Sequence, residues 1–319
     1  MKKIAVLTSG GDAPGMNACI RAVVRSGIVN GYEVVGIIGG YQGLIDENYR
    51  TLGLRDVGNI IQTGGTILKT SRCSAFLTEQ GFNKAVQNYK KAKFEAIIVI
   101  GGNGSLTGAT ELYKAGVNVV GLPGTIDNDL GYTDFTLGFD TAVNTVTNLL
   151  NNVRDTSSAH DRVCVVEVMG RKCGDIALFA GMSAGAEIVL IPEVVTPMEE
   201  VYKKLLNSAK TGKKSSIVVV AEGVGNANDV AKQIYEHTGL ESKAVVIGHL
   251  QRGGSPSMAD RVFASRLGVC AVESIKNGEM NIAIGTKNNK INKMNIEKAI
   301  KTNNVFDEFD YKINSIISI

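Results

Sequence analysis

Tryptophan is absent from the chain, and its five cysteines form no Cys-x-x-Cys pair. Their odd number and scattered positions favour reduced thiols over a disulfide framework or a zinc site. No apolar run reaches the roughly 18 residues that a membrane span requires. The apolar stretch after Met1-Lys2-Lys3 stops at Thr8, so a first strand is expected there rather than a signal peptide. These absences predict a soluble, cytoplasmic protein.

An excess of one charge is also lacking. The 34 Lys and Arg residues balance 31 Asp and Glu residues and leave a net charge of +3, which argues against a protein built to bind nucleic acid. Proline is scarce, with 5 residues, whereas glycine contributes 37 of the 319 residues. At about 150 residues per domain, this length suggests two domains. No Walker A motif and no G-x-G-x-x-G fingerprint occurs, which disfavours the P-loop and dinucleotide-binding classes.

Short runs rich in Val and Ile recur along the chain without polar alternation. Such runs are typical of parallel strands that are covered by helices on both faces. The sequence therefore predicts an α/β fold with two doubly wound, mainly parallel sheets. The expected strands are Ile4–Leu7, Val34–Ile38, Ala96–Ile100, Val117–Leu122, Val163–Val168, Glu187–Ile191, Ile217–Ala221, Val245–Leu250 and, in a late Lys/Asn-rich segment, Ile282–Ile284.

Helical patterns lie between these strands. Asn17–Asn30 and Asp140–Val153 keep their apolar residues on one face. A further helix is expected to run to Ala209 from the capping box Thr196-Pro197-Met198-Glu199, with Thr196 as its N-cap.

Five loops that follow expected strands carry unusual residues, and parallel sheets bind ligands at the carboxyl ends of their strands. The loops are Thr8–Gly15, Gly101–Ser105, Pro123–Asp129, Met169–Arg171 and His249–Gly254. The first two offer glycine amides to phosphate, and the last two place an arginine beside glycine for a phosphate monoester. If the third loop is extended, Asp127 and Asp129 converge and suit a base and a magnesium ligand.

Each of these loops alone could be an ordinary turn or a solvated surface. Together they contain what phosphoryl transfer needs, namely phosphate-binding amides, carboxylates and arginines. The residues thus favour a kinase that acts on a phosphorylated small molecule.

The motifs GGDAPGMN, GGNGS, PGTIDND, MGRKCGD and HLQRGGSP, in this order, resemble those of the bacterial ATP-dependent 6-phosphofructokinases, and the resemblance covers essentially the whole chain. It implies transfer of phosphate from Mg²⁺-ATP to the 1-hydroxyl of fructose 6-phosphate in glycolysis. It also implies an allosteric homotetramer with the active site in the cleft between two domains. The implied domains are 1–138 plus 252–305 for ATP and 139–251 plus 306–319 for the sugar phosphate.

The resemblance assigns roles to individual residues. Asp127 corresponds to the base, with Thr125, Arg72 and Arg171 as further catalytic residues. Asn103 and Asp129 correspond to the metal site. The implied nucleotide site contains Gly11, Arg72, Cys73, Gly102, Asn103, Gly104 and Ser105. The implied sugar-phosphate site contains Thr125, Ile126, Asp127, Met169, Gly170, Arg171, Glu222, His249, Leu250, Gln251 and Arg252, together with Arg162 and Lys243 from the neighbouring subunit.

An effector site for a nucleoside diphosphate or a phosphoenolpyruvate-type ligand is implied as well. Its residues correspond to Arg21, Arg25, Arg55, Asn59, Arg154, Gly185, Glu187, Thr211, Lys213 and Lys214. Four positions depart from the family pattern. Asn103 replaces a metal-binding aspartate, Lys243 replaces an arginine, and Asn59 and Thr211 replace an acid and a lysine.

Two alternatives remain open. Pyrophosphate-dependent phosphofructokinases typically carry aspartate in place of Gly104 and lysine in place of Gly124, so the two glycines favour ATP. The substitution at Asn103 leaves room for a weakly active or regulatory paralogue.

Overall fold

A computed structural model describes residues 1–318 and divides the chain into two compact units. Unit 1 consists of Met1–Thr141 and Arg252–Asn304, and unit 2 consists of Ala142–Gln251 and the segment that starts at Val305. Among the helices of residues 1–318, none is both long enough and apolar enough to cross a membrane.

Unit 1 is built on a seven-stranded sheet with the order β11-β10-β5-β4-β1-β2-β3. All neighbours pair in parallel except the two edge strands, β3 and β11, which are antiparallel. The late Lys/Asn-rich segment joins this sheet because β10 pairs with β5. The strands are β1 (Lys3–Ser9), β2 (Glu33–Ile37), β3 (Tyr49–Thr51), β4 (Phe94–Gly101), β5 (Val119–Pro123), β10 (Ile282–Lys287) and β11 (Lys290–Asn295).

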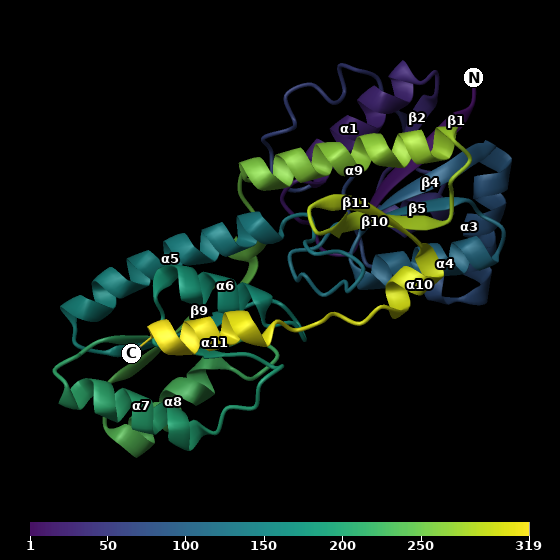
Figure 1. Ribbon diagram of the computed structural model, residues 1–319. Helices are drawn as coiled ribbons and strands as arrows, with labels where there is room; N and C mark the ends of the chain where they lie inside the picture. The colour runs from purple at the N-terminus through teal and green to yellow at the C-terminus, as the bar shows by residue number, and fades with distance from the viewer. Residues whose placement is uncertain (319) are drawn as a thin grey trace. The chain divides into compact units, whose positions relative to one another are not determined.

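Helices cover both faces of this sheet (Figure 1). On one face, α1 (Met16–Val29) and α9 (Met258–Lys276) run side by side. A Cβ on Gly268 of α9 would lie 2.6 Å from Ala22 Cβ of α1, so glycine permits their close approach. The other face is covered by α2 (Gly40–Ile45), α3 (Glu79–Ala92), α4 (Asn103–Lys114) and α10 (Ile296–Lys301), with the 3₁₀ turn η1 (Ala75–Leu77) beside them.

Unit 2 is built on a four-stranded parallel sheet with the order β7-β8-β6-β9. Val201 and Leu205 of α7 and Ile234 of α8 pack on one face of this sheet. The strands are β6 (Val163–Val168), β7 (Ile188–Leu190), β8 (Ser216–Ala221) and β9 (Ser242–Val246). The remaining elements are α5 (Phe139–Ala159), α6 (Asp175–Ala184), α7 (Met198–Lys210), α8 (Ala227–Thr238), η2 (Gly248–Arg252) and α11 (Glu308–Ile317). The parallel pairing in both sheets confirms the predicted α/β class.

The predicted strand Val245–Leu250 is wrong after Val246. β9 ends at Val246, which pairs with Glu167 near the end of β6, and Gly248 turns the chain with a φ of +56°. As an edge strand, β9 has only β6 to pair with among the described residues, so pairing ends where β6 ends. The chain then forms η2.

The predicted capping role of Thr196 is also wrong. Pro197 occupies the N-cap of α7 with extended backbone angles. The hydroxyl of Thr196 instead lies 3.3 Å from the hydroxyl of Tyr311 in α11. A long-range partner has therefore replaced the local capping contact.

Candidate active site and effector cluster

Three loops of unit 1 meet because the strands that precede them end at the same level. Ser9 of β1 pairs with Gly101 of β4, and Gly101 pairs with Pro123 of β5. We call the segments that follow the first glycine loop (Gly10–Gly15), the second glycine loop (Gly101–Ser105) and the aspartate loop (Gly124–Gly138).

The packing between these loops is tight. A Cβ on Gly10 would lie 3.2 Å from Ser105 Oγ, and a Cβ on Gly102 would lie 3.2 Å from Thr125 Cβ. The structure thus brings residues of three predicted loops together.

The second glycine loop leads directly into α4 with a bare helix N-terminus. Gly102 is the N-cap and provides no side-chain cap, and Asn103 and Gly104 are exposed. The hydroxyl of Tyr41 donates to the carbonyl of Ser105 and so holds the first turn of α4 in place. Exposed amides at a helix N-terminus attract anions. This end of α4 is therefore suited to bind a phosphate group.

Gly104 and Gly124, the two glycines by which the sequence favoured ATP over pyrophosphate, differ in their surroundings. Apart from its chain neighbours and the backbone of α4, no atom of residues 1–318 lies within 4 Å of a Cβ built on Gly104, so this position faces open space. A Cβ on Gly124 would lie 2.8 Å from Ile100 Cγ2 and 3.1 Å from the amide nitrogen of Gly101. A larger residue at position 124 would therefore push against the backbone of β4.

Arg72 and Cys73 lie on a segment that is attached to the first glycine loop. The hydroxyl of Thr70 donates to the carbonyl of Gly10 at 2.6 Å, and the thiol of Cys73 donates to Gln42 Oε1 at 3.2 Å. The Arg72 residue itself is exposed. These contacts place the start of this segment beside the loop in which a nucleotide was expected.

Asp127 is almost fully buried, with 3% of its surface exposed. Its amide donates to Thr125 Oγ1 at 3.2 Å, and Arg252 Nη2 lies 4.0 Å from its Oδ1. Arg252 also donates to the carbonyl of Asp12 at 3.2 Å. It can reach that position because a Cβ on Gly11 would lie only 2.3 Å from Arg252 Nη1.

The aspartate loop is not extended, contrary to the sequence-based expectation. The chain bends at Ile126 and Asp127, and Asn128 has a φ of +52°. Asn128 Oδ1 accepts the amide of Thr136 at 2.9 Å and so holds this bend. Alternation of side chains therefore does not apply, and the argument that it brings Asp127 and Asp129 to one side is wrong.

In unit 2, Glu222 and Gln251 organise the loop after β6. Glu222 Oε1 accepts the amides of Gly170 at 3.1 Å and Arg171 at 2.7 Å, and Gln251 Oε1 accepts the amide of Met169 at 3.1 Å. The loop needs these contacts because Arg171 has a φ of +55°. Residues predicted to share a sugar-phosphate site thus meet at the carboxyl end of β6.

The other members of that predicted site in η2 lie on the surface. His249 and Leu250 are exposed, whereas Gln251 is fully buried.

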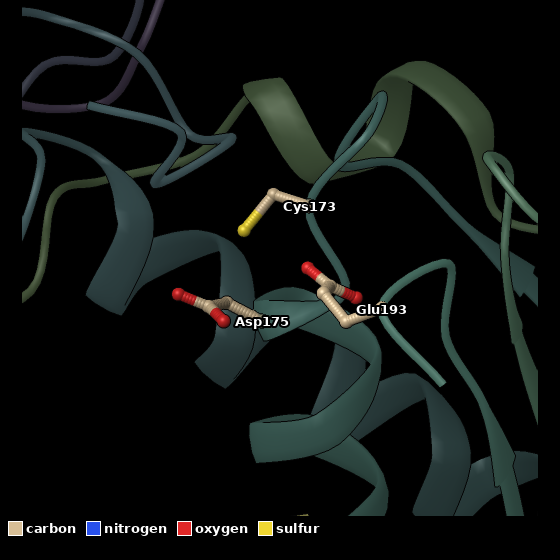
Figure 2. Close-up of side chains that lie close together, drawn as sticks. All are labelled: Cys173, Asp175 and Glu193. Carbon is tan, nitrogen blue, oxygen red and sulfur yellow. The ribbon is translucent and has the colours of Figure 1, made fainter. Parts of the chain in front are cut away.

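A thiol and two carboxylates converge behind this loop (Figure 2). Cys173, Asp175 and Glu193 each place one potential ligand atom within 4.8 Å of the others. Glu193 Oε1 accepts the amide of Gly174 at 2.8 Å. Burial, and then the charge of Asp175, raises the pKa of the Cys173 thiol. The hydrogen bond from Gly174 to Glu193 joins the residue before α6 to the segment that follows β7.

Arg162 and Lys243 lie at the opposite end of the same sheet. Arg162 immediately precedes β6, and Lys243 pairs with Cys164 near the start of that strand. The six residues of β6 separate Arg162 from Met169, and at about 3.3 Å per residue they put the two roughly 20 Å apart. The two residues are therefore remote from the loop that Glu222 holds in their own chain.

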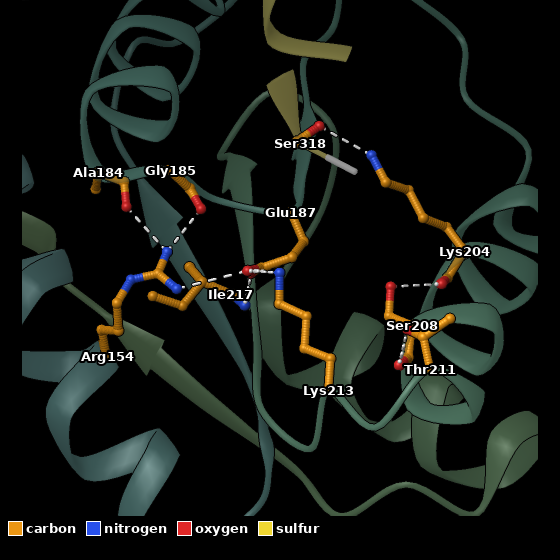
Figure 3. Close-up of polar contacts among 10 residues, drawn as sticks. All are labelled: Arg154, Ala184, Gly185, Glu187, Lys204, Ser208, Thr211, Lys213, Ile217 and Ser318. Atoms are coloured by element: carbon orange, nitrogen blue, oxygen red, sulfur yellow. Dashed lines mark hydrogen bonds and ion pairs between the residues drawn. The ribbon is translucent and has the colours of Figure 1, made fainter. Parts of the chain in front are cut away.

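The predicted effector residues of unit 2 surround the buried carboxylate of Glu187 (Figure 3). Glu187 Oε1 lies 2.7 Å from Lys213 Nζ and 3.5 Å from Arg154 Nη1, and its Oε2 accepts the amide of Ile217. Arg154 also donates to the carbonyls of Ala184 and Gly185, at 2.9 Å and 2.7 Å. This part of the effector prediction forms one connected cluster.

Other predicted effector residues are arranged differently. The hydroxyl of Thr211 donates to the carbonyl of Ser208, and Lys214 pairs with Asp161 at 3.2 Å on the surface. Four further residues belong to unit 1: Arg21 and Arg25 in α1, and the exposed Arg55 and Asn59.

The sequence analysis missed two side chains that hold the loops of unit 1. Asn17 joins the segment before Arg72 by donating to the carbonyl of Gly64 at 3.0 Å and accepting the amide of Ile67 at 2.8 Å. Asp260, which is 2% exposed, accepts the amides of Gly138 and Thr141. The only local signal for Asp260 is the Ser-x-x-Asp pattern at Ser257, which indicates a helix start rather than a distant partner.

Residues 3–275 match the family model described as phosphofructokinase. The chain is 52% identical to the ATP-dependent 6-phosphofructokinase of Clostridioides difficile (strain 630) over 319 residues, which is the full length of both chains.

Solved structures agree with this match. Phosphofructokinase from Saccharomyces cerevisiae is 34% identical with a TM-score of 0.88, and the alignment covers 99% of this chain but 47% of the yeast chain. The pyrophosphate-dependent phosphofructokinase from Marinobacter aquaeolei has a TM-score of 0.85 at 21% identity, with 97% of this chain and 86% of that chain covered. The latter likeness concerns the fold alone.

Proposed function

The chain belongs to the phosphofructokinase family, and from this we propose that it transfers the γ-phosphoryl group of ATP to the 1-hydroxyl of fructose 6-phosphate. The observation that carries the proposal is that the three neighbouring strands β1, β4 and β5 end at the same level of the sheet. It places the bare N-terminus of α4 beside the buried carboxylate of Asp127, so phosphate-binding amides and a proton acceptor share one edge of the sheet.

The nucleotide is proposed to bind at the two glycine loops, with Gly11, Arg72, Cys73 and residues Gly102 to Ser105 around it. The free amides of α4 suit its phosphates, and the open space at Gly104 leaves room for a nucleotide rather than pyrophosphate alone. Arg72 is exposed beside the first glycine loop, where its guanidinium is available to the transferred group.

Asp127 is the proposed general base. In the reaction, the O1 hydroxyl of the sugar attacks the γ-phosphorus, the bond to the β-phosphate oxygen breaks, and the hydroxyl proton passes to the carboxylate. Arg252 Nη2 lies 4.0 Å from Asp127 Oδ1, so a positive charge stands beside the carboxylate that would receive the proton. Thr125, whose hydroxyl accepts the Asp127 amide, holds the loop next to this group.

The sugar phosphate is proposed to bind the loop that Glu222 and Gln251 hold, through Met169, Gly170 and Arg171, with His249 and Arg252 as further contacts. A guanidinium matches a phosphate monoester with two parallel hydrogen bonds. Arg162 and Lys243 lie at the other end of the sheet, and this supports the proposal that a neighbouring subunit lends them. That arrangement requires an oligomer, for which we propose a homotetramer.

Magnesium is proposed to accompany the nucleotide, held by Asn103 and Asp129. The exposed amide oxygen at position 103 suits a hard cation, and Mg²⁺ often takes only one or two protein oxygens. When bound, the ion would neutralise charge on the transferring phosphates.

Regulation is proposed to act through the Glu187 cluster, where Arg154 and Lys213 supply positive charge for a phosphorylated effector such as a nucleoside diphosphate or a phosphoenolpyruvate-type ligand. A glycolytic reaction of ATP and a sugar phosphate takes place in the cytoplasm, and we propose this compartment for the chain.

The test is a coupled assay of the purified protein with fructose 6-phosphate and magnesium, supplied with either ATP or pyrophosphate. Formation of ADP in step with fructose 1,6-bisphosphate is the expected result. Activity with pyrophosphate alone would replace the proposal with the pyrophosphate-dependent alternative. No turnover with either donor would favour the regulatory paralogue.

A further inference from the structure

The carboxylate of Asp260 is a buried acceptor at the start of α9. Its Oδ1 accepts the amide of Gly138 at 2.7 Å, and its Oδ2 accepts the amide of Thr141 at 2.9 Å and the hydroxyl of Thr141. Only 2% of its surface is exposed. All three donors belong to the end of the aspartate loop and the residues that follow it.

A small ring of hydrogen bonds closes around this carboxylate. The amide of Ser257 donates to Thr141 Oγ1 at 2.9 Å, and Ser257 Oγ in turn accepts the amide of Asp260 at 3.2 Å. Thr141 therefore uses its hydroxyl as donor to Asp260 and as acceptor from Ser257. The ring joins the aspartate loop to the segment between Arg252 and α9.

The first glycine loop packs against the same point. A Cβ on Gly15 would lie 2.7 Å from Leu137 Cδ1 and 3.6 Å from Asp260 Cβ. A Cβ on Gly138 would lie 2.8 Å from Ala13 Cβ. The first glycine loop and the aspartate loop thus meet at one carboxylate that none of the assigned roles uses.

A backbone hydrogen bond closes the aspartate loop at its two ends. The amide of Leu137 donates to the carbonyl of Pro123 at 2.7 Å, which joins the two ends of the loop. Contacts with β10 and β11 also hold the loop, because the amide of Asp134 donates to the carbonyl of Thr286 and Asn292 Nδ2 donates to the carbonyl of Tyr132. Gly138 and Thr141 attach the end of the loop to α9 through Asp260. Asp127 lies on this loop, whereas Arg252 lies on the segment that leads to α9.

We propose that Asp260 is a positioning residue, which fixes the aspartate loop against the start of α9 and so sets the placement of Asp127 relative to Arg252. The inference rests on the proposed function, because its kinetic consequence is a loss of turnover. A carboxylate fits this position because the three groups that bond to it, two amides and one hydroxyl, all donate. An asparagine would keep the shape but turn an NH₂ group toward one of these donors.

The test compares Asp260→Asn and Thr141→Val with Thr141→Ser, which keeps the hydroxyl. Thr110→Val serves as the matched control, because it removes another fully buried hydroxyl of unit 1 that bonds only within α4. For each variant, kcat, the KM for Mg-ATP, thermal unfolding and amide hydrogen exchange of residues 124–137 are measured, with residues 101–105 as the internal reference for exchange.

We expect kcat to fall about 10- to 100-fold in Asp260→Asn, since small misplacements of catalytic groups have costs of this order. Thr141→Val should show a smaller loss that Thr141→Ser restores. The KM for Mg-ATP should stay within about threefold, because β4 and α4 hold the second glycine loop without Asp260. Exchange in residues 124–137 should accelerate, and that in residues 101–105 should not. Thr110→Val should lose stability without losing kcat.

Either of two results overturns the inference. One is unchanged exchange and a kcat within twofold of the parent in both Asp260→Asn and Thr141→Val. The other is a parallel loss of kcat and Mg-ATP affinity that Thr110→Val reproduces, which would indicate a purely structural role. If Asp260→Asn does not fold, Thr141→Val decides. A parent without phosphofructokinase activity would refute the proposed function, and the exchange data would still decide whether Asp260 holds the loop.

Discussion

Arg252 Nη2 lies 4.0 Å from Asp127 Oδ1 within unit 1, and the second guanidinium nitrogen of Arg252 donates to the carbonyl of Asp12. The glycine at position 11 makes this placement possible, because a Cβ there would overlap the guanidinium. The pair links the first glycine loop to the aspartate loop. It gives Asp127 a fixed positive neighbour in an environment that is largely shielded from water.

Asp127→Asn should lower kcat by about 10²–10⁴-fold while Mg-ATP still binds, because loss of a general base removes the proton acceptor and not the phosphate site. Steady-state kinetics and nucleotide titration measure the two effects. Asp134→Asn is the control, since it removes a carboxylate from the same loop that pairs with Lys287. A variant that keeps kcat within a few-fold would refute the assignment of the base.

Mixing Arg162→Ala with Asp127→Ala protein should restore part of the activity after subunit exchange. Arg162 precedes β6 at the end of the sheet opposite to Met169, so it is expected to serve a neighbour. Hybrids then contain some sites in which both residues are intact. Mixing Asp127→Ala with Arg171→Ala is the control and should recover nothing, because Arg171 is expected to serve its own chain. Verified hybrids without activity would speak against sharing.

Asn103→Asp should lower the magnesium concentration that gives half-maximal rate, by roughly fivefold or more. A charged oxygen holds the metal better than an amide oxygen, and hydrogen bonds to charged groups contribute about 1.5–3 kcal/mol. Thr107→Asp adds the same charge one turn further along α4 and should not have this effect. The measurement is a magnesium titration at saturating fructose 6-phosphate. Superimposable titration curves for the parent and the variant would show that Asn103 does not bind the metal.

Gly104→Asp should fold normally, because no atom lies within 4 Å of a Cβ at this position. It should nevertheless reduce kcat/KM for Mg-ATP by about tenfold or more, since it brings a negative charge to the helix end proposed for the phosphates. Gly104→Ala adds only the Cβ and should change kcat/KM little. Equal effects of the two substitutions would show that crowding rather than charge is responsible.

The stability of the parent relative to Asp260→Asn should fall as pH rises. Burial is the first cause that raises the pKa of Asp260, and Asp140 adds to it, whereas the hydrogen bonds of Thr141 and Gly138 oppose it. A raised pKa in the folded state favours the protonated form. The corresponding stabilisation is therefore complete below the ordinary pKa of aspartate, near 4, and is lost as pH rises through the folded value.

Chemical denaturation of both proteins between pH 4 and 7.5 tests this expectation. The difference between their free energies of unfolding removes the contribution of all groups that they share. The expectation is contradicted if the difference in unfolding free energy between the parent and Asp260→Asn stays constant with pH, or if it changes in favour of the parent as pH rises.

Much of the architecture could be predicted because it depends on local pattern. The runs Ile4–Leu7, Ala96–Ile100 and Val163–Val168 are apolar throughout, and they form central parallel strands because both of their faces are buried. The glycines and aspartates that follow these strands indicated ligand loops. Glycine lets a ligand approach the backbone closely, and aspartate offers a carboxylate. The family expected from these motifs is confirmed.

Two of the predictions that failed depended on partners far along the chain, and the third depended on a hydrogen bond within the loop itself. Val245–Leu250 reads as a strand, but β9 ends where its neighbour β6 ends. The local pattern predicts that Thr196 is an N-cap, but its hydroxyl pairs with the hydroxyl of Tyr311. The aspartate loop reads as extended, but Asn128 bends it by bonding to Thr136. In each case a strand neighbour or a hydrogen-bond partner that the local pattern does not show decided the structure.

The amino-acid sequence by itself thus determined the fold class and the family, because burial periodicity and loop composition are local properties. Only the tertiary structure decided that β1, β4 and β5 end at one level, that Arg252 reaches Asp127, and that Asp260 holds the aspartate loop. Strand register and hydrogen-bond partners that are distant in sequence depend on how the whole core packs. No short pattern specifies them.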